Sequence, residues 1–282
     1  MKRTFRIASA LIVISASLAG AQTESPPRDP SEAQMLTVNA AIGAVTAAAW
    51  RFVTHKPLLP GAARGAVSGL AAYGGRRMIA TSGKPLHWWI GRELSALASS
   101  EVMNAARSRP VLERAVIPLG PVRIHVDRSK GLKIVPRIDA VSVVAALVVG
   151  LSDDNTFALD ESLASGTLAF LAPETSTQVG GNVGAVITIS QLAPDGPYYP
   201  LESKRRVMAH ELVHTAQYDF VFAAWSDPVQ ELITARSPVV AKVTKYLDFN
   251  LTLPFQIGAN TMLDYSERPW EMEARALAKH TR

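Results

Sequence analysis

The pattern His-Glu-x-x-His at positions 210–214 most limits how this chain can fold. Two histidines four residues apart can bind the same metal ion if the segment is helical, because residues four apart then lie on one face. Glu211 lies one step around that helix, where it can reach a metal-bound water but does not easily bind the metal. The pattern therefore predicts a helix that carries two metal ligands and a general base, the parts of a zinc hydrolase.

A catalytic zinc site needs a third protein ligand. The chain has no cysteine, which excludes disulfides, thiolate ligands and cysteine nucleophiles, so the third ligand must be Asp, Glu or His. The best source is the acidic segment 271–275 in the last expected helix. Glu271 and Glu273 lie two residues apart and point to different sides of that helix, so only one can face the metal. We prefer Glu273, whose face also carries Trp270 and Leu277, and keep Glu271 in reserve.

Residues 210–217 and 271–274 together resemble gluzincin-type metallopeptidase domains. These include bacterial domains of unknown function that combine H-E-x-x-H-x-x-Q with a later E-x-E-A helix. The resemblance covers about residues 185–279 and is limited to these motifs. It implies zinc as the cofactor, a peptide or protein as the substrate, and Glu273, the second glutamate of E-x-E-A, as the third ligand.

The surroundings of the motif add one candidate residue and two departures from known patterns. Families that resemble this one usually steady the oxyanion with a His or Tyr, which makes Tyr265 a candidate, with simple packing as its alternative. The metzincin continuation is missing, because Gln217 and Phe220 stand where that class needs glycine and histidine. The gap between His214 and Glu271 is long and leaves room for two inserted helices.

Residues 1–21 predict a secretory signal peptide. Three basic residues precede a short apolar stretch, and small residues follow at the cleavage site; the basic residues are Lys2, Arg3 and Arg6. The apolar stretch is shorter than the roughly 20 residues that a membrane span needs, so cleavage is favoured over an uncleaved anchor. We therefore expect an exported protein, located in the periplasm or cell envelope or secreted.

The remaining composition bounds the domain layout and the partners. Residues 22–32 are rich in proline and charge and predict a disordered lead-in. The net charge of +5 includes the three basic residues of the signal peptide, and no dense Lys/Arg stripe follows, so nucleic acid is not an expected partner.

Residues 33–109 are rich in Gly and Ala and predict three helices, at about 32–53, 62–81 and 86–107. The second opens with glycines at every fourth position, which lets helix backbones approach closely and is common in membrane helices; these are Gly61, Gly65 and Gly69. A close-packed soluble hairpin and membrane association through residues 36–81 both fit this pattern.

Residues 110–282 predict a zincin-like domain in an α+β chain with a mostly antiparallel central sheet. Alternation and β-branched residues predict strands at 122–126, 132–136, 141–151, 157–159, 167–171 and 185–190. Residues 180–182 predict a turn. Helices follow at about 201–222, 227–235, 238–247 and 267–279. The strand at 185–190 is either a core strand or a sheet edge along which a peptide could pair.

Two functions from different classes fit these observations. The first is an exported zinc-dependent metallopeptidase-like hydrolase that uses Glu211 as its base. The second is a non-catalytic envelope protein, in which the glycine-rich hairpin associates with membranes and the zinc site is structural or vestigial.

Overall fold

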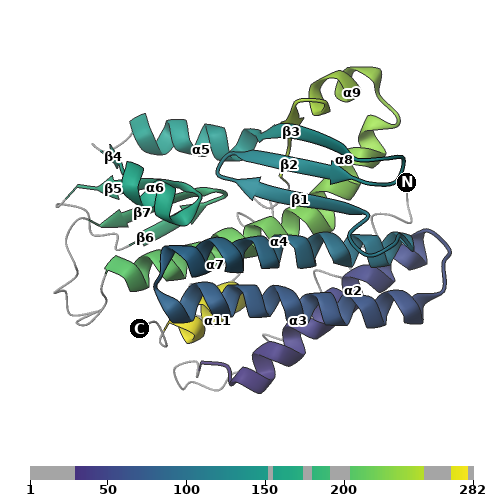
Figure 1. Ribbon diagram of the computed structural model, residues 1–282, viewed down its shortest axis with the longest axis horizontal. Helices are drawn as coiled ribbons and strands as arrows, with labels where there is room; N and C mark the ends of the chain where they lie inside the picture. Colours follow the sequence, from purple (N-terminus) through teal and green to yellow (C-terminus); the bar gives the residue numbers. More distant parts are fainter. Residues whose placement is uncertain (1–28, 152–154, 174–179, 191–203, 251–267, 279–282) are drawn as a thin grey trace.

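The computed structural model describes residues 29–151, 155–173, 180–190, 204–250 and 268–278, which form a mixed α+β fold (Figure 1). This confirms the predicted class. The expected signal peptide and residues 22–28 of the expected lead-in lie outside the described residues.

The strands form two four-stranded sheets rather than one central sheet. The first contains, in spatial order, β1 (Arg114–Leu119), β2 (Val122–Asp127), β3 (Lys133–Asp139) and β8 (Leu247–Asp248). The second contains β4 (Thr156–Phe157), β5 (Leu168–Ala172), β7 (Val186–Ser190) and β6 (Gly180–Val183). One pair in each sheet is parallel, β3 with β8 and β5 with β7, and the other pairs are antiparallel.

Three long helices form the N-terminal part, as the sequence predicts: α2 (Glu32–Val53), α3 (Leu58–Ser82) and α4 (Pro85–Arg107). The start of α2 is a capping box, in which the Ser31 hydroxyl accepts from the Gln34 amide and the Gln34 side chain accepts from the Ser31 amide. Of the described helices, α2 alone is long and apolar enough to cross a membrane.

Glycines allow these helices to touch backbone to backbone. Gly65 and Gly69 of α3 lie against Gly43 and Asn39 of α2, so close that a Cβ atom at either glycine would collide with backbone atoms. Gly75 of α3 meets α4 in the same way. The four-residue glycine spacing is therefore used within the chain, in the contact of α3 with α2.

The prediction of a strand at 141–151 is wrong, because residues Ala140–Leu151 form helix α5. The Asp139 carboxylate accepts from the backbone amides of Val141 and Ser142, at 3.2 and 3.3 Å, and so caps the first turn. It also accepts from the Ser142 hydroxyl at 2.8 Å. Propensity favoured a strand because the segment is rich in valine, but the cap decides for a helix. A further short helix, α6 (Leu159–Ser165), follows β4.

The helix that carries the His-Glu-x-x-His motif is α7 (Lys204–Val221), followed by a π-helical turn, η1 (Phe222–Ser226), and by α8 (Asp227–Thr234) and α9 (Pro238–Thr244). It packs against α3, α4, the second sheet and α11 (Pro269–Ala278), the C-terminal helix (Figure 1). One apolar cluster joins these elements and includes Tyr73, Ile187, Leu212 and Ala274. The core therefore contains residues from both the 33–109 and the 110–282 range.

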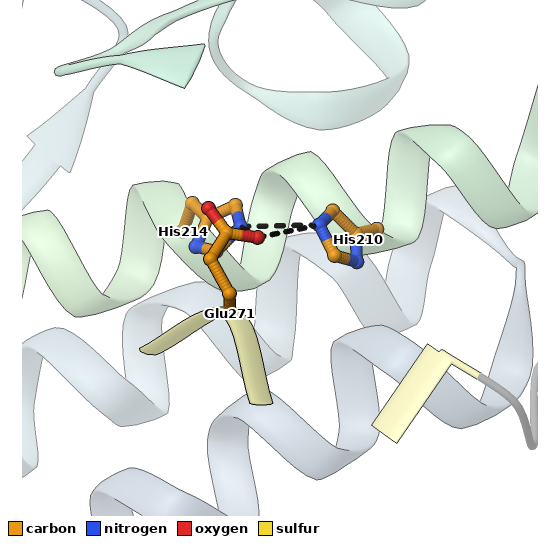
Figure 2. Close-up of side chains that lie close together, drawn as sticks. All are labelled: His210, His214 and Glu271. Carbon is orange, nitrogen blue, oxygen red and sulfur yellow. Dashed lines mark hydrogen bonds and ion pairs between the residues drawn. The ribbon is translucent and has the colours of Figure 1, made fainter. Parts of the chain in front are cut away.

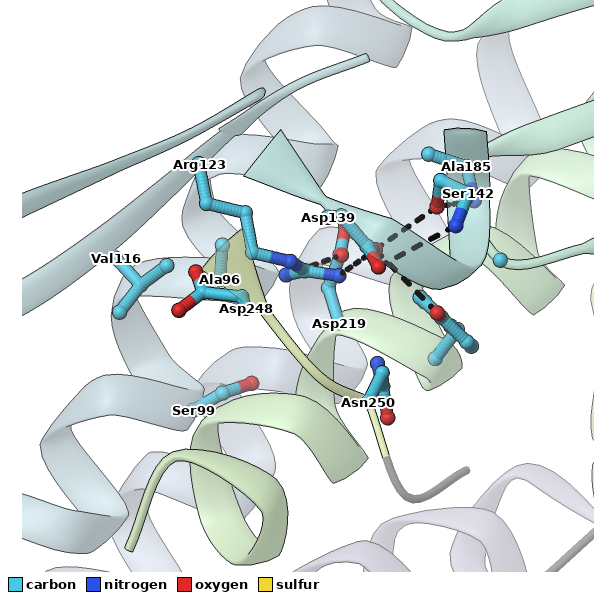
Figure 3. Close-up of polar contacts among 12 residues, drawn as sticks. Ala96, Ser99, Val116, Arg123, Asp139, Ser142, Ala185, Asp219, Asp248 and Asn250 are labelled. Atoms are coloured by element: carbon cyan, nitrogen blue, oxygen red, sulfur yellow. Dashed lines mark hydrogen bonds and ion pairs between the residues drawn. The ribbon is translucent and has the colours of Figure 1, made fainter. Parts of the chain in front are cut away.

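A buried ion network fixes the second half of α7 (Figure 3). The Arg123 guanidinium, 1% exposed, binds Asp139 at 2.9 Å and Asp219 at 3.0 Å. Arg92 of α4 also binds Asp219, at 3.3 Å. Each buried charge has a partner of opposite sign, which such burial requires. The network joins β2, the β3–α5 junction and α4 to the motif helix.

Candidate metal centre

Two histidines and one carboxylate converge between α7 and α11 (Figure 2). His210 Nε2 and His214 Nε2 lie 3.1 Å apart on one face of α7, as the four-residue spacing predicts. Glu271 Oε2, from α11, lies 3.2 Å from His214 Nε2 and 3.5 Å from His210 Nε2. These three ligand atoms form a group that could hold a metal ion.

The size of this triangle suits a small metal ion. Ligand atoms at about 2.0–2.1 Å from a tetrahedral zinc ion lie about 3.3–3.4 Å from one another. The three observed separations, 3.1, 3.2 and 3.5 Å, bracket that value. Two imidazole nitrogens with one carboxylate oxygen suit zinc, iron, nickel or copper better than calcium or magnesium, which prefer oxygen alone.

The structure reverses the order of the two candidate third ligands. Glu271, the reserve, faces the histidines, and Glu273, the preferred residue, does not. The Glu273 carboxylate instead accepts a hydrogen bond from Gln217 Nε2 at 2.7 Å and another from Asn39 Nδ2 at 2.9 Å. The reason is helical phase: residues two apart lie about 200° apart around a helix, so when Glu271 faces His210 and His214, Glu273 points elsewhere.

Glu211 lies beside the metal group, as the motif predicts. It is 6% exposed, and burial raises the pKa of its carboxyl, while the nearby His214 and His210 act in the opposite direction. A Cβ atom at Gly180 would lie 2.6 Å from Glu211 Oε1, so the backbone of β6 passes directly against this carboxylate.

Strand β6 follows the Glu211 side of α7 residue by residue. Gly180 lies against Glu211, Asn182 donates to the Thr215 hydroxyl at 2.8 Å, and Gly184, in the turn after β6, lies against the Tyr218 ring. Two strand residues rise about 6.8 Å and one helical turn about 5.4 Å, so the two elements stay nearly in step. The turn predicted at 180–182 is therefore wrong, because its glycines serve a strand that approaches a helix closely.

Of the two alternatives for the strand at 185–190, the structure shows the core strand. It forms as β7 and lies inside the second sheet, between β5 and β6. The strands at the two edges of the described sheet are β4 and β6, and β6 passes Glu211.

The imidazole of His214 is buried, and its other nitrogen has a partner: Nδ1 lies 2.8 Å from Gln217 Oε1. Burial opposes the charged imidazolium, but the hydrogen bond and charge of Glu271 outweigh it and raise the pKa of His214 to about 9. A metal cation at Nε2 would displace the proton that the imidazolium carries on this atom.

The other candidate residues lie away from this group. Tyr265 lies outside the described residues. His125 lies in the first sheet, where its Nε2 is 2.6 Å from a carboxylate oxygen of the buried Asp248. Sequence reasoning missed Asn39 and Arg76, which contact Glu273 across 234 and 197 positions. No local pattern could have paired residues so far apart.

Comparisons of the chain with protein-family models, with curated proteins and with solved structures gave no match. The chemistry of the site is therefore inferred from its own residues.

Proposed function

We propose that this chain is an exported, zinc-dependent hydrolase of the metallopeptidase type, with a zincin-like C-terminal part. His210, His214 and Glu271 would bind the zinc ion, and Glu211 would act as the general base. The observation that carries this proposal is the convergence of three ligand atoms within 3.5 Å of one another, with a buried carboxylate one residue beyond the first histidine. The same ligand set occurs in non-haem iron oxygenases, and the adjacent Glu211 favours hydrolysis instead.

The roles of the residues follow from their positions. A zinc ion held by His210, His214 and Glu271 would supply Lewis-acid chemistry, polarising the scissile carbonyl and activating a water molecule. Glu211 takes the proton of the attacking water and delivers it to the leaving amine. Tyr265 remains the candidate donor to the oxyanion.

Metal content tests the site directly. Zinc-loaded wild type, washed free of excess metal, should hold one zinc ion per chain by mass spectrometry, and His214→Ala should hold none. Loading with Fe²⁺ under reducing conditions serves as the comparison. A wild type that retains no zinc, or that retains iron in preference to zinc, would remove the proposal.

Substitution of the base separates binding from chemistry. Glu211→Gln should bind zinc as the wild type does and lose about 10²–10⁴-fold in the rate of peptide hydrolysis, measured with a quenched fluorescent peptide library. Thr215→Val, on the same side of α7, is the matched control. Unchanged hydrolysis in Glu211→Gln would exclude Glu211 as the base.

A second function is favoured by one observation, the exposed apolar face of α2. This face carries Val38, Ile42, Val45 and Phe52. The chain would then be a non-catalytic envelope protein that lies on membranes through residues 36–81, with a structural or vestigial zinc site. Flotation with liposomes tests it: Ile42→Ser/Phe52→Ser should abolish co-flotation, and a wild type that stays at the bottom of the gradient would exclude it.

A further inference from the structure

We propose that Glu273 is a positioning residue that fixes, through Gln217, the imidazole tautomer which His214 presents to the metal. The helices α2 and α3 hold Glu273 in that position. This inference rests on the metal binding proposed above. It also gives the N-terminal helices, which lie outside the His-Glu-x-x-His motif, a role in the site.

The contacts form a continuous path from the metal group to α2. His214 Nδ1 lies 2.8 Å from Gln217 Oε1, and Gln217 Nε2 lies 2.7 Å from Glu273 Oε2. The other oxygen of Glu273 accepts from Asn39 Nδ2 at 2.9 Å and lies 3.2 Å from Arg76 Nη2. Asn39 and Arg76 are 7% and 3% exposed and contact each other, so both are held in place.

The path fixes the direction of each hydrogen bond. A carboxylate only accepts, so Gln217 must turn its NH₂ group towards Glu273. The same NH₂ group lies 3.3 Å from the backbone oxygen of Trp270, a second acceptor. The carbonyl oxygen of Gln217 then faces His214, and it can only accept. His214 must therefore carry a proton on Nδ1, which leaves the lone pair of its neutral ring on Nε2, the atom that faces His210 and Glu271.

The need for a carboxylate at position 273 follows from the number of hydrogen-bond donors that face it. Asn39, Arg76 and Gln217 all present donors to Glu273, and a glutamine there would offer only one oxygen. In Glu273→Gln, the simplest relief is rotation of the Gln217 amide, which brings its NH₂ group to His214 Nδ1. His214 would then carry its proton on Nε2 and lose the lone pair that binds the metal.

Three variants test the inference. Glu273→Gln should reduce zinc affinity about 10–100-fold, the usual effect of removing a hydrogen-bond partner of a ligand. The double variant Gln217→Glu/Glu273→Gln should recover most of that loss. The carboxylate at position 217 accepts from His214, and the amide at position 273 donates to that carboxylate. Gln217→Met, which removes the acceptor outright, should lose affinity to a similar extent. Competition with a chromophoric zinc chelator measures all three.

The tautomer distinguishes positioning from a merely structural role. In ¹⁵N-labelled zinc-loaded wild type and double variant, long-range ¹H–¹⁵N spectra should show the His214 proton on Nδ1. In metal-free Glu273→Gln at a pH above the titration of His214, the proton should move to Nε2. Circular dichroism checks that each variant folds. If Glu273→Gln does not fold, the double variant and Gln217→Met decide the question.

The outcomes separate the two proposals. A wild type that binds no zinc overturns the proposed function and this inference with it. A wild type that binds zinc, with Glu273→Gln and Gln217→Met within twofold of its affinity, overturns only the inference. Reduced affinity in the single variants without recovery in the double variant also overturns it, because the swap restores the hydrogen-bond pattern.

Discussion

Glu93 lies on α4 with both carboxylate oxygens buried and without a hydrogen-bond donor among the described residues. Burial raises the pKa of Glu93 to about 7, and the nearby Arg92 only partly offsets this. The folded chain then binds a proton that the unfolded chain releases near pH 4.5. Folding stability from this group is therefore highest at low pH and falls as the pH rises from about 4.5 to about 7.

Removing this charge should stabilise the protein at alkaline pH. Glu93→Gln should raise the free energy of unfolding at pH 8 by about 1–2 kcal/mol and leave it nearly unchanged at pH 4.5, with solvent screening keeping the gain below the full value of the pKa shift. Urea unfolding at the two pH values measures this. Glu101→Gln, on the same helix, removes an ion pair with Arg64 and should instead lower stability at pH 8. Equal effects of Glu93→Gln at both pH values would contradict the prediction.

At the level of residues, the sequence predicted two ligands and their neighbour better than the third ligand. His210, His214 and Glu211 follow from local helical geometry, which a single pattern defines. The choice between Glu271 and Glu273 depends on which face of α11 packs on α7, and a tertiary contact sets that. Ala274 and Leu277, one turn after Glu271 and Glu273 respectively, are both buried, so the sequence of α11 alone could not decide between the two glutamates.

The contact of α2 with α3 depends on glycine at defined positions and not on glycine in general. A Cβ atom at Gly65 would collide with the backbone of Gly43 and lie 2.8 Å from the Ala47 side chain. A Cβ atom at Gly74, on the same helix, would meet nothing within 4 Å. The two glycines therefore provide a matched pair of sites.

Alanine should have opposite effects at these two sites. Gly65→Ala should lower the free energy of unfolding by about 1–3 kcal/mol, because α2 and α3 must move apart. Gly74→Ala should raise it by about 0.5–1 kcal/mol, because alanine favours the helix and its side chain meets open space. Thermal and urea unfolding measure both. A gain at Gly65 as large as at Gly74 would show that the close contact does not form.

At the level of elements, those with clear boundaries were predicted well. Proline and glycine separate α2, α3 and α4, and the predicted and observed ends agree within a few residues. α5 was missed because its valines favour a strand, whereas its Asp139 cap was not recognised. β6 was missed because Gly180 and Gly181 resemble a turn. The close approach of α7 explains the glycine at position 180.

In the whole molecule, the candidate metal site lies where the C-terminal helix meets the N-terminal helices. The helix α11 carries Glu271 and contacts both α7 and α3, and its Glu273 contacts Asn39 of α2. Zinc binding should therefore slow hydrogen exchange in α11 and, through Glu273, in α2 around Asn39. The remote α9 (Pro238–Thr244) should not change and is the internal control. Mass spectrometry of peptides from metal-free and zinc-loaded protein measures this. Slowing confined to α7 and α11 would mean that α2 is not coupled to the site.

The same connection limits how the chain could contact a membrane. Inserting α2 would separate Asn39 from Glu273 and Gly43 from Gly65, so membrane association of the folded chain must use the outward face of α2. Liposomes should therefore leave the zinc content unchanged. Loss of zinc on liposome binding would indicate that α2 leaves the fold and inserts.

The sequence separation of the candidate ligands determines the order in which they are synthesised. Glu271 follows His214 by 57 positions in the sequence, and Glu273 follows Asn39 by 234 positions. A ribosome makes the two histidines, and the helices that support them, well before the third ligand exists. If the site binds a metal, the growing chain could offer it only the two imidazoles, and the full ligand set would form only once α11 has been made and has docked. A chain that stops before residue 271 would keep the recognisable motif and lack the complete site.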